Sequence, residues 1–115
     1  MRNVTVLTLG LFVFAGALLL ADGRAMAADT KPATVEIRID NFSFGPASVT
    51  VPAGTEITWV NHDDIPHTVT SDDKTTFKSH PLDTDDKFAF KFDKLGTYTY
   101  FCSLHPKMTA TVVVK

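Results

Sequence analysis

Between residues 33 and 115, apolar residues alternate with polar ones, and this period of two constrains the fold more than any other feature. The pattern is clearest over residues 35–39 and 88–92, where Val, Ile or Phe occupies every second position. Side chains of a strand point alternately to opposite faces, so such segments predict half-buried strands. No segment here sustains the 3.6-residue period of an amphipathic helix. Short strands separated by Gly and Pro turns predict an all-β domain, either a sandwich or a barrel. The expected strands cover residues 35–39, 49–51, 57–59, 67–71, 88–92, 97–101 and 109–114.

The first 27 residues have the order of regions found in a secretory signal. A short start with Arg2 precedes an apolar stretch over residues 4–21, and Ala25 and Ala27 supply the small residues that a signal peptidase reads. We therefore predict a signal peptide over residues 1–27, a single domain over residues 28–115 and a periplasmic location. The alternative is an uncleaved membrane anchor, because the apolar stretch is nearly long enough to span a bilayer.

Cys102 is the only cysteine of the chain, so a disulfide within the chain is impossible. An unpaired thiol is a liability in an oxidising compartment unless something occupies it, which makes Cys102 a candidate ligand. The formal net charge is −2, and this mildly acidic balance gives no reason to expect nucleic-acid binding. Aspartates gather in the middle third of the chain, where we interpret them as a solvated face.

Residues 102–108 carry three side chains that ligate soft metals, each three residues after the last: Cys102, His105 and Met108. The segment lies between two expected strands, so it forms a short loop that can direct all three side chains to one point. His67, at the start of another expected strand, is the best candidate for a second imidazole. Two imidazoles, a thiolate and a weakly bound thioether form the trigonal set with a long axial ligand that selects copper.

These segments resemble the cupredoxins, the family of blue copper proteins that includes plastocyanin and azurin, over essentially the whole range from residue 35 to residue 115. The matching motifs are IPHTV at residues 65–69, GTYTYFC at residues 96–102 and the ligand loop CSLHPKM. The two-residue gap between His105 and Met108 is similar to that of the amicyanin-like members, which have a short ligand loop. The resemblance implies a Greek-key β-sandwich of about seven to eight strands, with the copper site at one end.

The resemblance also implies a role for each residue of the motifs. One type 1 copper ion per chain would be bound by His67, Cys102, His105 and Met108, with His67 buried and His105 more exposed. The backbone N–H of Thr68 is expected to donate to the Cys102 sulfur, a contact that tunes such centres.

Three further residues have structural interpretations. Residues 93–98 resemble a tyrosine corner, in which the hydroxyl of Tyr98 would bond nearby backbone. His62 and His80 do not fit the ligand motif, and both are interpreted as surface residues in loops.

The predicted function is one-electron transfer by a small blue copper protein without enzymatic activity. Copper enzymes with related domains need additional histidines, often as His-x-His pairs, and this chain has four histidines and no such pair. The alternative is a periplasmic copper-binding or copper-delivery protein, which could use the same ligands.

The expected partner is a redox protein, an amine dehydrogenase or a c-type cytochrome. It would dock on an apolar patch around His105 formed by Pro46, Leu104, Pro106 and Pro66. We also expect a monomer with no nucleic-acid partner and no stable membrane insertion after signal cleavage.

Overall fold

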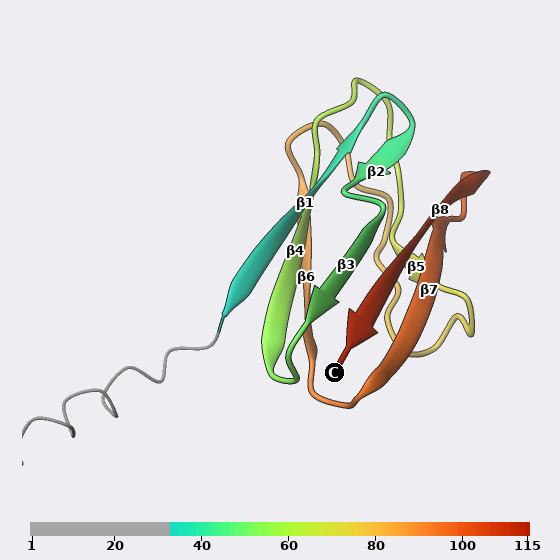
Figure 1. The fold of residues 1–115 in the computed structure, drawn as a ribbon. Helices are drawn as coiled ribbons and strands as arrows, with labels where there is room; N and C mark the ends of the chain where they lie inside the picture. The colour runs from blue at the N-terminus through green and yellow to red at the C-terminus, as the bar shows by residue number, and fades with distance from the viewer. Residues whose placement is uncertain (1–32) are drawn as a thin grey trace, which may run out of the picture. The chain divides into compact units, whose positions relative to one another are not determined.

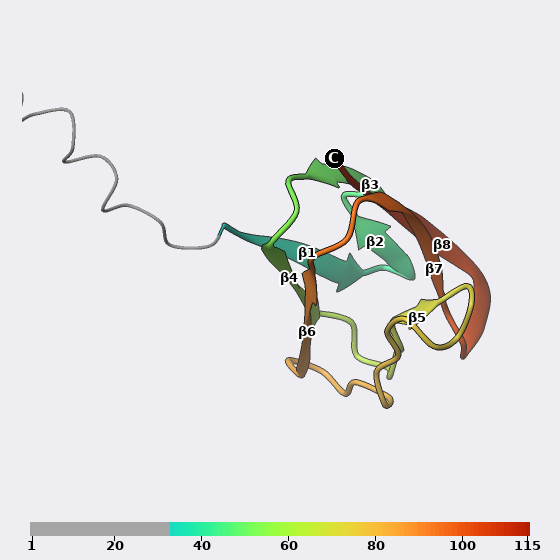
Figure 2. The same ribbon diagram turned by 90° about the horizontal axis from the view of Figure 1, so that it is seen from below.

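Eight strands form two four-stranded sheets in the computed structural model, which describes residues 33–115 (Figure 1). The sheets have the strand orders β2-β1-β4-β6 and β3-β8-β7-β5, and Figure 2 shows them as two layers. The strands are β1 (Thr34–Asp40), β2 (Ser43–Gly45), β3 (Ser48–Val51), β4 (Thr55–Asn61), β5 (Thr70–Ser71), β6 (Lys87–Phe92), β7 (Gly96–Cys102) and β8 (His105–Val114). The predicted all-β sandwich of seven to eight strands is confirmed. The predicted signal peptide over residues 1–27 lies outside the described residues.

Parallel and antiparallel pairs are combined in each sheet. β1 runs parallel to β4, with Ile37 opposite Trp59, and β3 runs parallel to β8. The other pairs, β1 with β2, β4 with β6, β5 with β7 and β7 with β8, are antiparallel. Since parallel neighbours cannot be joined by a tight hairpin, the chain crosses repeatedly between the two layers. Within residues 33–115 no helix is long and apolar enough to cross a membrane.

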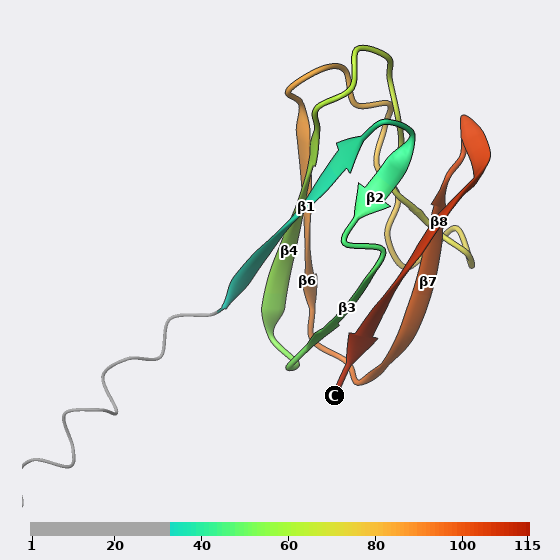
Figure 3. The same ribbon diagram turned by 45° about the horizontal axis from the view of Figure 1, so that its top comes forward.

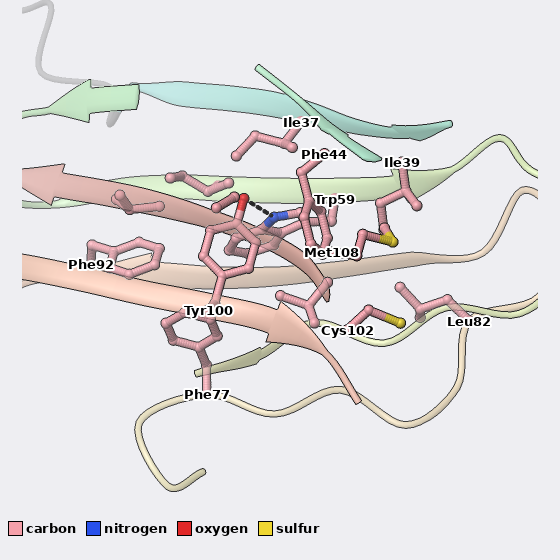
Figure 4. Packing of buried hydrophobic residues seen from close by; sticks show 14 of the residues in the cluster. Ile37, Ile39, Phe44, Trp59, Phe77, Leu82, Phe92, Tyr100, Cys102 and Met108 are labelled. Carbon is pink, nitrogen blue, oxygen red and sulfur yellow. Dashed lines mark hydrogen bonds between the residues drawn. The ribbon is translucent and has the colours of Figure 1, made fainter. Parts of the chain in front are cut away.

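Aromatic side chains fill the space between the sheets. Trp59 on β4 and Tyr100 on β7 are fully buried, and the Trp59 indole N–H donates to the Tyr100 hydroxyl at 3.1 Å (Figure 4). The two rings meet edge to face at 5.5 Å, while Phe77 and Phe92 also pack against Trp59. Burial raises the pKa of Tyr100 to about 12, because it penalises the phenolate more than the Trp59 N–H stabilises it.

The tyrosine corner before β7 is confirmed. The hydroxyl of Tyr98 donates to the backbone carbonyl of Lys94 at 2.7 Å. Gly96 lies between them with a φ of 152°, in a region that favours glycine, and a Cβ there would lie 3.7 Å from the Tyr98 ring. The corner therefore fixes the point at which β7 begins, the strand that leads to the ligand segment (residues 102–108).

The start of the polar stretch between β5 and β6, interpreted from the sequence as part of a solvated face, is held together by hydrogen bonds to Asp73. Asp73 accepts hydrogen bonds from the hydroxyls of Ser71 and Thr76 and from the backbone N–H groups of Thr75 and Thr76. These bonds hold the pKa of Asp73 well below its usual range, the hydroxyl of Ser71 having the largest effect. Asp73 thus organises a loop that returns the chain to the core at the buried Phe77.

The strand predicted over residues 67–71 is shorter in the structure, where only Thr70–Ser71 forms β5. The preceding residues pair with other backbone only at isolated points: His67 and Leu82 exchange backbone hydrogen bonds, and the Val69 carbonyl accepts the N–H of Ser79. Two N–H groups go to side chains. The N–H of Thr68 donates to the sulfur of Cys102, and the N–H of Val69 donates to a serine hydroxyl. The alternation pattern could not reveal these side-chain acceptors.

The ligand segment is also tighter than predicted. β8 begins at His105 rather than near residue 109, and Cys102 lies opposite His105 in the β7–β8 pair. A register irregularity between Phe101 and Cys102 accompanies the turn. The segment is therefore the tip of a hairpin. Figures 1 and 3 show this tip at the same end of the sandwich as the β1–β2 turn and the β4–β5 connection.

Candidate metal centre

Three of the four predicted ligands come together at that end of the sandwich. One ligand atom each of His67, Cys102 and His105 lies within 4.8 Å of the other two. The Cys102 sulfur is 3.7 Å from Nδ1 of His67 and 3.6 Å from Nδ1 of His105. His67 and Cys102 are fully buried, whereas His105 is half-buried, as the family resemblance implied for the two histidines.

These separations fit a first-row transition metal. Bonds of about 2.3 Å to sulfur and 2.0 Å to nitrogen, at trigonal or tetrahedral angles, place the two ligand atoms roughly 3.5–3.7 Å apart. The two sulfur–nitrogen distances match that range without rearrangement. A thiolate beside two imidazoles is a soft donor set that suits copper or zinc, so softness alone does not distinguish them.

Met108, the fourth predicted ligand, lies on β8 and is 6% exposed. It belongs to the same buried cluster as Cys102, and Figure 4 places both sulfur-bearing side chains at one end of the core. Met108 also lines a surface hollow together with His105. A thioether in this place adds a soft, weak donor, which favours copper over zinc.

The Cys102 sulfur is held by Thr68 from the adjacent connection. The Thr68 backbone N–H donates to the sulfur at 3.3 Å, as predicted. The Thr68 hydroxyl accepts the backbone N–H of Ser103 at 2.7 Å and lies 2.8 Å from the Ser103 hydroxyl. One residue therefore fixes both the sulfur and the turn that follows it, which limits how far the thiolate can move.

Asp63 orients His67 from the side opposite Cys102. Its carboxylate lies 2.7 Å from Nε2 of His67, four residues along the chain. A carboxylate only accepts, so Nε2 carries the proton and Nδ1 keeps its lone pair for a metal. The same carboxylate accepts the backbone N–H groups of Asn41 at 2.7 Å and Phe42 at 3.0 Å.

The charge of Asp63 follows from these contacts. Burial raises the pKa of Asp63. This effect is outweighed by hydrogen bonds from the N–H groups of Phe42 and Asn41 and by the His67 ring, which all lower the pKa. The pKa therefore lies below its ordinary value, and the carboxylate is ionised at neutral pH. From the sequence, Asp63 was interpreted only as part of a solvated acidic face. Its four-residue spacing from His67 would predict a contact in a helix, and residues 63–67 form none.

Phe42 is a second residue that the sequence analysis missed. Its ring lies edge-on to the His67 ring at 5.6 Å and to the His105 ring at 5.1 Å. No strand was expected over residues 41–46, but β2 forms within them and Phe44 is buried. Alternation would place Phe42 and Phe44 on one face, but Phe44 is buried in the core, whereas Phe42 is exposed and lies against the two imidazoles.

The surface beside His105 is apolar, but it differs from the predicted patch. The hollow there is lined by Phe42, Leu104, His105, Pro106, Lys107 and Met108. Leu104 and Pro106 agree with the prediction, whereas Pro46 and Pro66 do not line the hollow and Phe42 does.

The other two histidines take no part in the cluster. His80 is exposed, as predicted, and its Nδ1 lies 2.9 Å from the carbonyl of Pro81. His62 is half-buried rather than fully at the surface, with Nε2 3.3 Å from the Arg38 guanidinium. Among residues 33–115, the three-residue set around Cys102 is the only such group of His, Cys, Asp and Glu side chains.

Comparisons with known proteins agree with this geometry. A family model for the cupredoxin-like domain matches residues 10–114. In sequence, the chain is similar to amicyanin-alpha of Methylorubrum extorquens, with 33% identity over 116 residues that cover 91% of this chain and 92% of that protein.

Solved structures that are similar to the chain include two copper proteins. A purple cupredoxin from Nitrosopumilus maritimus has a TM-score of 0.67 and 34% identity, covering 70% of this chain and 99% of that one. A copper-containing nitrite reductase from Thermus scotoductus SA-01 has a TM-score of 0.68 and 27% identity. That match covers 74% of this chain but 23% of the reductase, so the likeness is to one portion of it.

Proposed function

The chain belongs to the cupredoxin-like family, and from this premise we propose that it is a type 1 copper protein that carries single electrons. One copper ion would be held by His67, Cys102, His105 and Met108. Bound there, copper supplies a one-electron couple whose charge is shared with the thiolate sulfur. The observation that carries the proposal is the buried Cys102 sulfur set 3.6–3.7 Å from two imidazole nitrogens.

The residues around the centre favour electron transfer because they hold the ligands still. Asp63 fixes His67 through Nε2, and Thr68 fixes Cys102 through its N–H and its hydroxyl. Ligands that are anchored in this way change position little between oxidation states, so little energy is spent on reorganisation. A site built to release its metal would gain nothing from such anchoring.

His105 provides the route between the centre and the surface. It is half-buried and lines the apolar hollow with Leu104 and Pro106. A small apolar contact suits a short-lived complex, since rapid turnover requires easy release. The proposed partner is therefore a redox protein, such as an amine dehydrogenase or a c-type cytochrome, that docks over His105. Export to the periplasm by the segment over residues 1–27 completes the proposal.

We propose that the protein is not an enzyme. The described residues offer a single cluster of metal-ligating side chains, and a second metal centre would need another. The chain spans less than a quarter of the nitrite reductase that it resembles in fold.

Redox cycling in the presence of a chelator separates an electron carrier from a copper-delivery protein. The protein is loaded with one equivalent of copper, then reduced and reoxidised repeatedly against a competing copper chelator. A carrier retains its copper and its visible spectrum through every cycle. Transfer of the copper to the chelator on reduction would instead assign the protein to copper delivery.

A further inference from the structure

The turn between β1 and β2 has a backbone that ordinary side chains rarely adopt. Asn41 has a φ of 52° and Phe42 a φ of 57°, so two consecutive residues other than glycine lie in the left-handed region. Asparagine tolerates this region, but a bulky residue such as Phe is an outlier there. A conformation of this kind persists only where the surroundings impose it.

Asp63 supplies the contacts that impose it. Its carboxylate accepts the N–H groups of Asn41 and Phe42, so both left-handed residues are fixed to the connection that precedes His67. The oxygen that accepts from Phe42 is also the one within 2.7 Å of His67 Nε2. The position of Phe42 is thereby coupled to the position of a ligand.

The two imidazoles are not held in the same way. His67 is fully buried and hydrogen-bonded to Asp63. Among the described residues, the ring of His105 makes no hydrogen bond apart from the 3.6 Å approach of its Nδ1 to Cys102. Two aromatic rings lie beside it: Phe42 edge-on at 5.1 Å and His67 at 4.9 Å.

We propose that Phe42 is a positioning residue, which holds the His105 ring toward the other ligands and covers both imidazoles against solvent. Asp63 sets Phe42 in place through the backbone of the turn. The inference rests on the proposed function, since it assigns a purpose to the ring at the copper centre. In the metal-free protein, too, Phe42 should already hold the His105 ring toward the other ligands.

Leu104 provides a matched control. Phe42 is 52% exposed and Leu104 is 48% exposed, and both line the hollow beside His105. If Phe42 served only as a docking surface, replacing either residue by alanine would affect partner binding alone. If Phe42 positions His105, only Phe42→Ala disturbs the centre.

The first experiment uses the metal-free full-length protein. Nuclear Overhauser contacts between the rings of His105 and His67 report whether His105 is held in place. We expect these contacts in the wild type, in Leu104→Ala and in Phe42→Leu, which keeps an apolar bulk, and we expect them to be lost in Phe42→Ala. Ring contacts that persist in Phe42→Ala would overturn the proposal.

The second experiment measures copper release from the loaded protein to a Cu(II) chelator. Removing a group that orients a ligand typically weakens metal binding by about 10–100-fold, so we expect Phe42→Ala to release copper at least about tenfold faster than Leu104→Ala. Equal release rates in the two variants would overturn the inference while leaving the proposed function intact. A wild type that forms no copper–thiolate band would overturn the proposed function instead, and the metal-free measurement would still decide the role of Phe42.

Discussion

Replacing Asp63 by alanine removes one carboxylate that serves three donors on two different segments. The donors are the His67 ring and the backbone N–H groups of Asn41 and Phe42, at 2.7, 2.7 and 3.0 Å. A hydrogen bond to a charged group contributes about 1.5–3 kcal/mol, and one to a neutral group about 0.5–1.5 kcal/mol. The His67 contact belongs at the upper end because that ring is fully buried. The two N–H groups lie near the surface, where water can take the place of the carboxylate, and their loss is further offset by relief of the left-handed backbone that they impose.

The expected loss in Asp63→Ala is therefore about 3 kcal/mol of unfolding free energy in the metal-free protein. At roughly 4–8 °C per kcal/mol for a domain of this size, the Tm should fall by roughly 12–24 °C. The assay is thermal unfolding at neutral pH, followed by circular dichroism. Metal is left out because binding to the folded state alone would add its own stabilisation.

Asp64→Ala is the control, because Asp64 is exposed and its carboxylate accepts no hydrogen bond from the described residues. The pH dependence adds a second check. The pKa of Asp63 is lowered on folding, so its contribution is present above the unfolded value of 3.8 and is lost as the pH falls through the folded value. The two variants should converge in stability at acidic pH. Equal Tm values for Asp63→Ala and Asp64→Ala at neutral pH would refute the reasoning.

Three further changes test other contacts. Tyr100→Phe leaves the buried Trp59 N–H without its acceptor, so urea unfolding should show a free energy of unfolding that is lower by about 1–3 kcal/mol. In a spectrophotometric titration of the variant, the phenol with a pKa of about 12 should be absent. Thr68→Ala removes the acceptor of the Ser103 N–H and should cost about 1 kcal/mol in the same assay, whereas the copper-loaded protein keeps its colour. Asp73→Asn should lower the Tm at neutral pH. The difference in Tm from the wild type should shrink only below about pH 4, because the lowered pKa keeps the Asp73 carboxylate ionised in the folded wild type until the pH is strongly acidic. A gap that did not change with pH would exclude a charged Asp73 as the cause.

The sequence predicted the features that arise from local pattern. Alternating apolar residues predicted most of the strands, and the spacing of Cys102, His105 and Met108 predicted a short loop rich in soft ligands. The backbone contact from Thr68 to Cys102 was predicted through the family resemblance and is present at 3.3 Å.

The missed features depend on contacts between segments that are distant in sequence. Phe42 reaches the histidines only because β1 and β4 run parallel, which brings the β1–β2 turn beside the connection that carries Asp63. No periodicity within residues 41–46 reports the left-handed backbone of that turn. The strand after His67 is also shorter than predicted, because the N–H groups of Thr68 and Val69 donate to side chains on other segments and so interrupt a continuous ladder.

The measurement that tests the central claim most directly is the visible spectrum of the purified protein during titration with Cu(II), beside that of Cys102→Ala. The claim predicts an intense sulfur-to-copper charge-transfer band that saturates at one copper per chain and is absent from the variant. A wild type that stays colourless, or that binds zinc as tightly as copper, would contradict a type 1 copper centre at His67, Cys102, His105 and Met108.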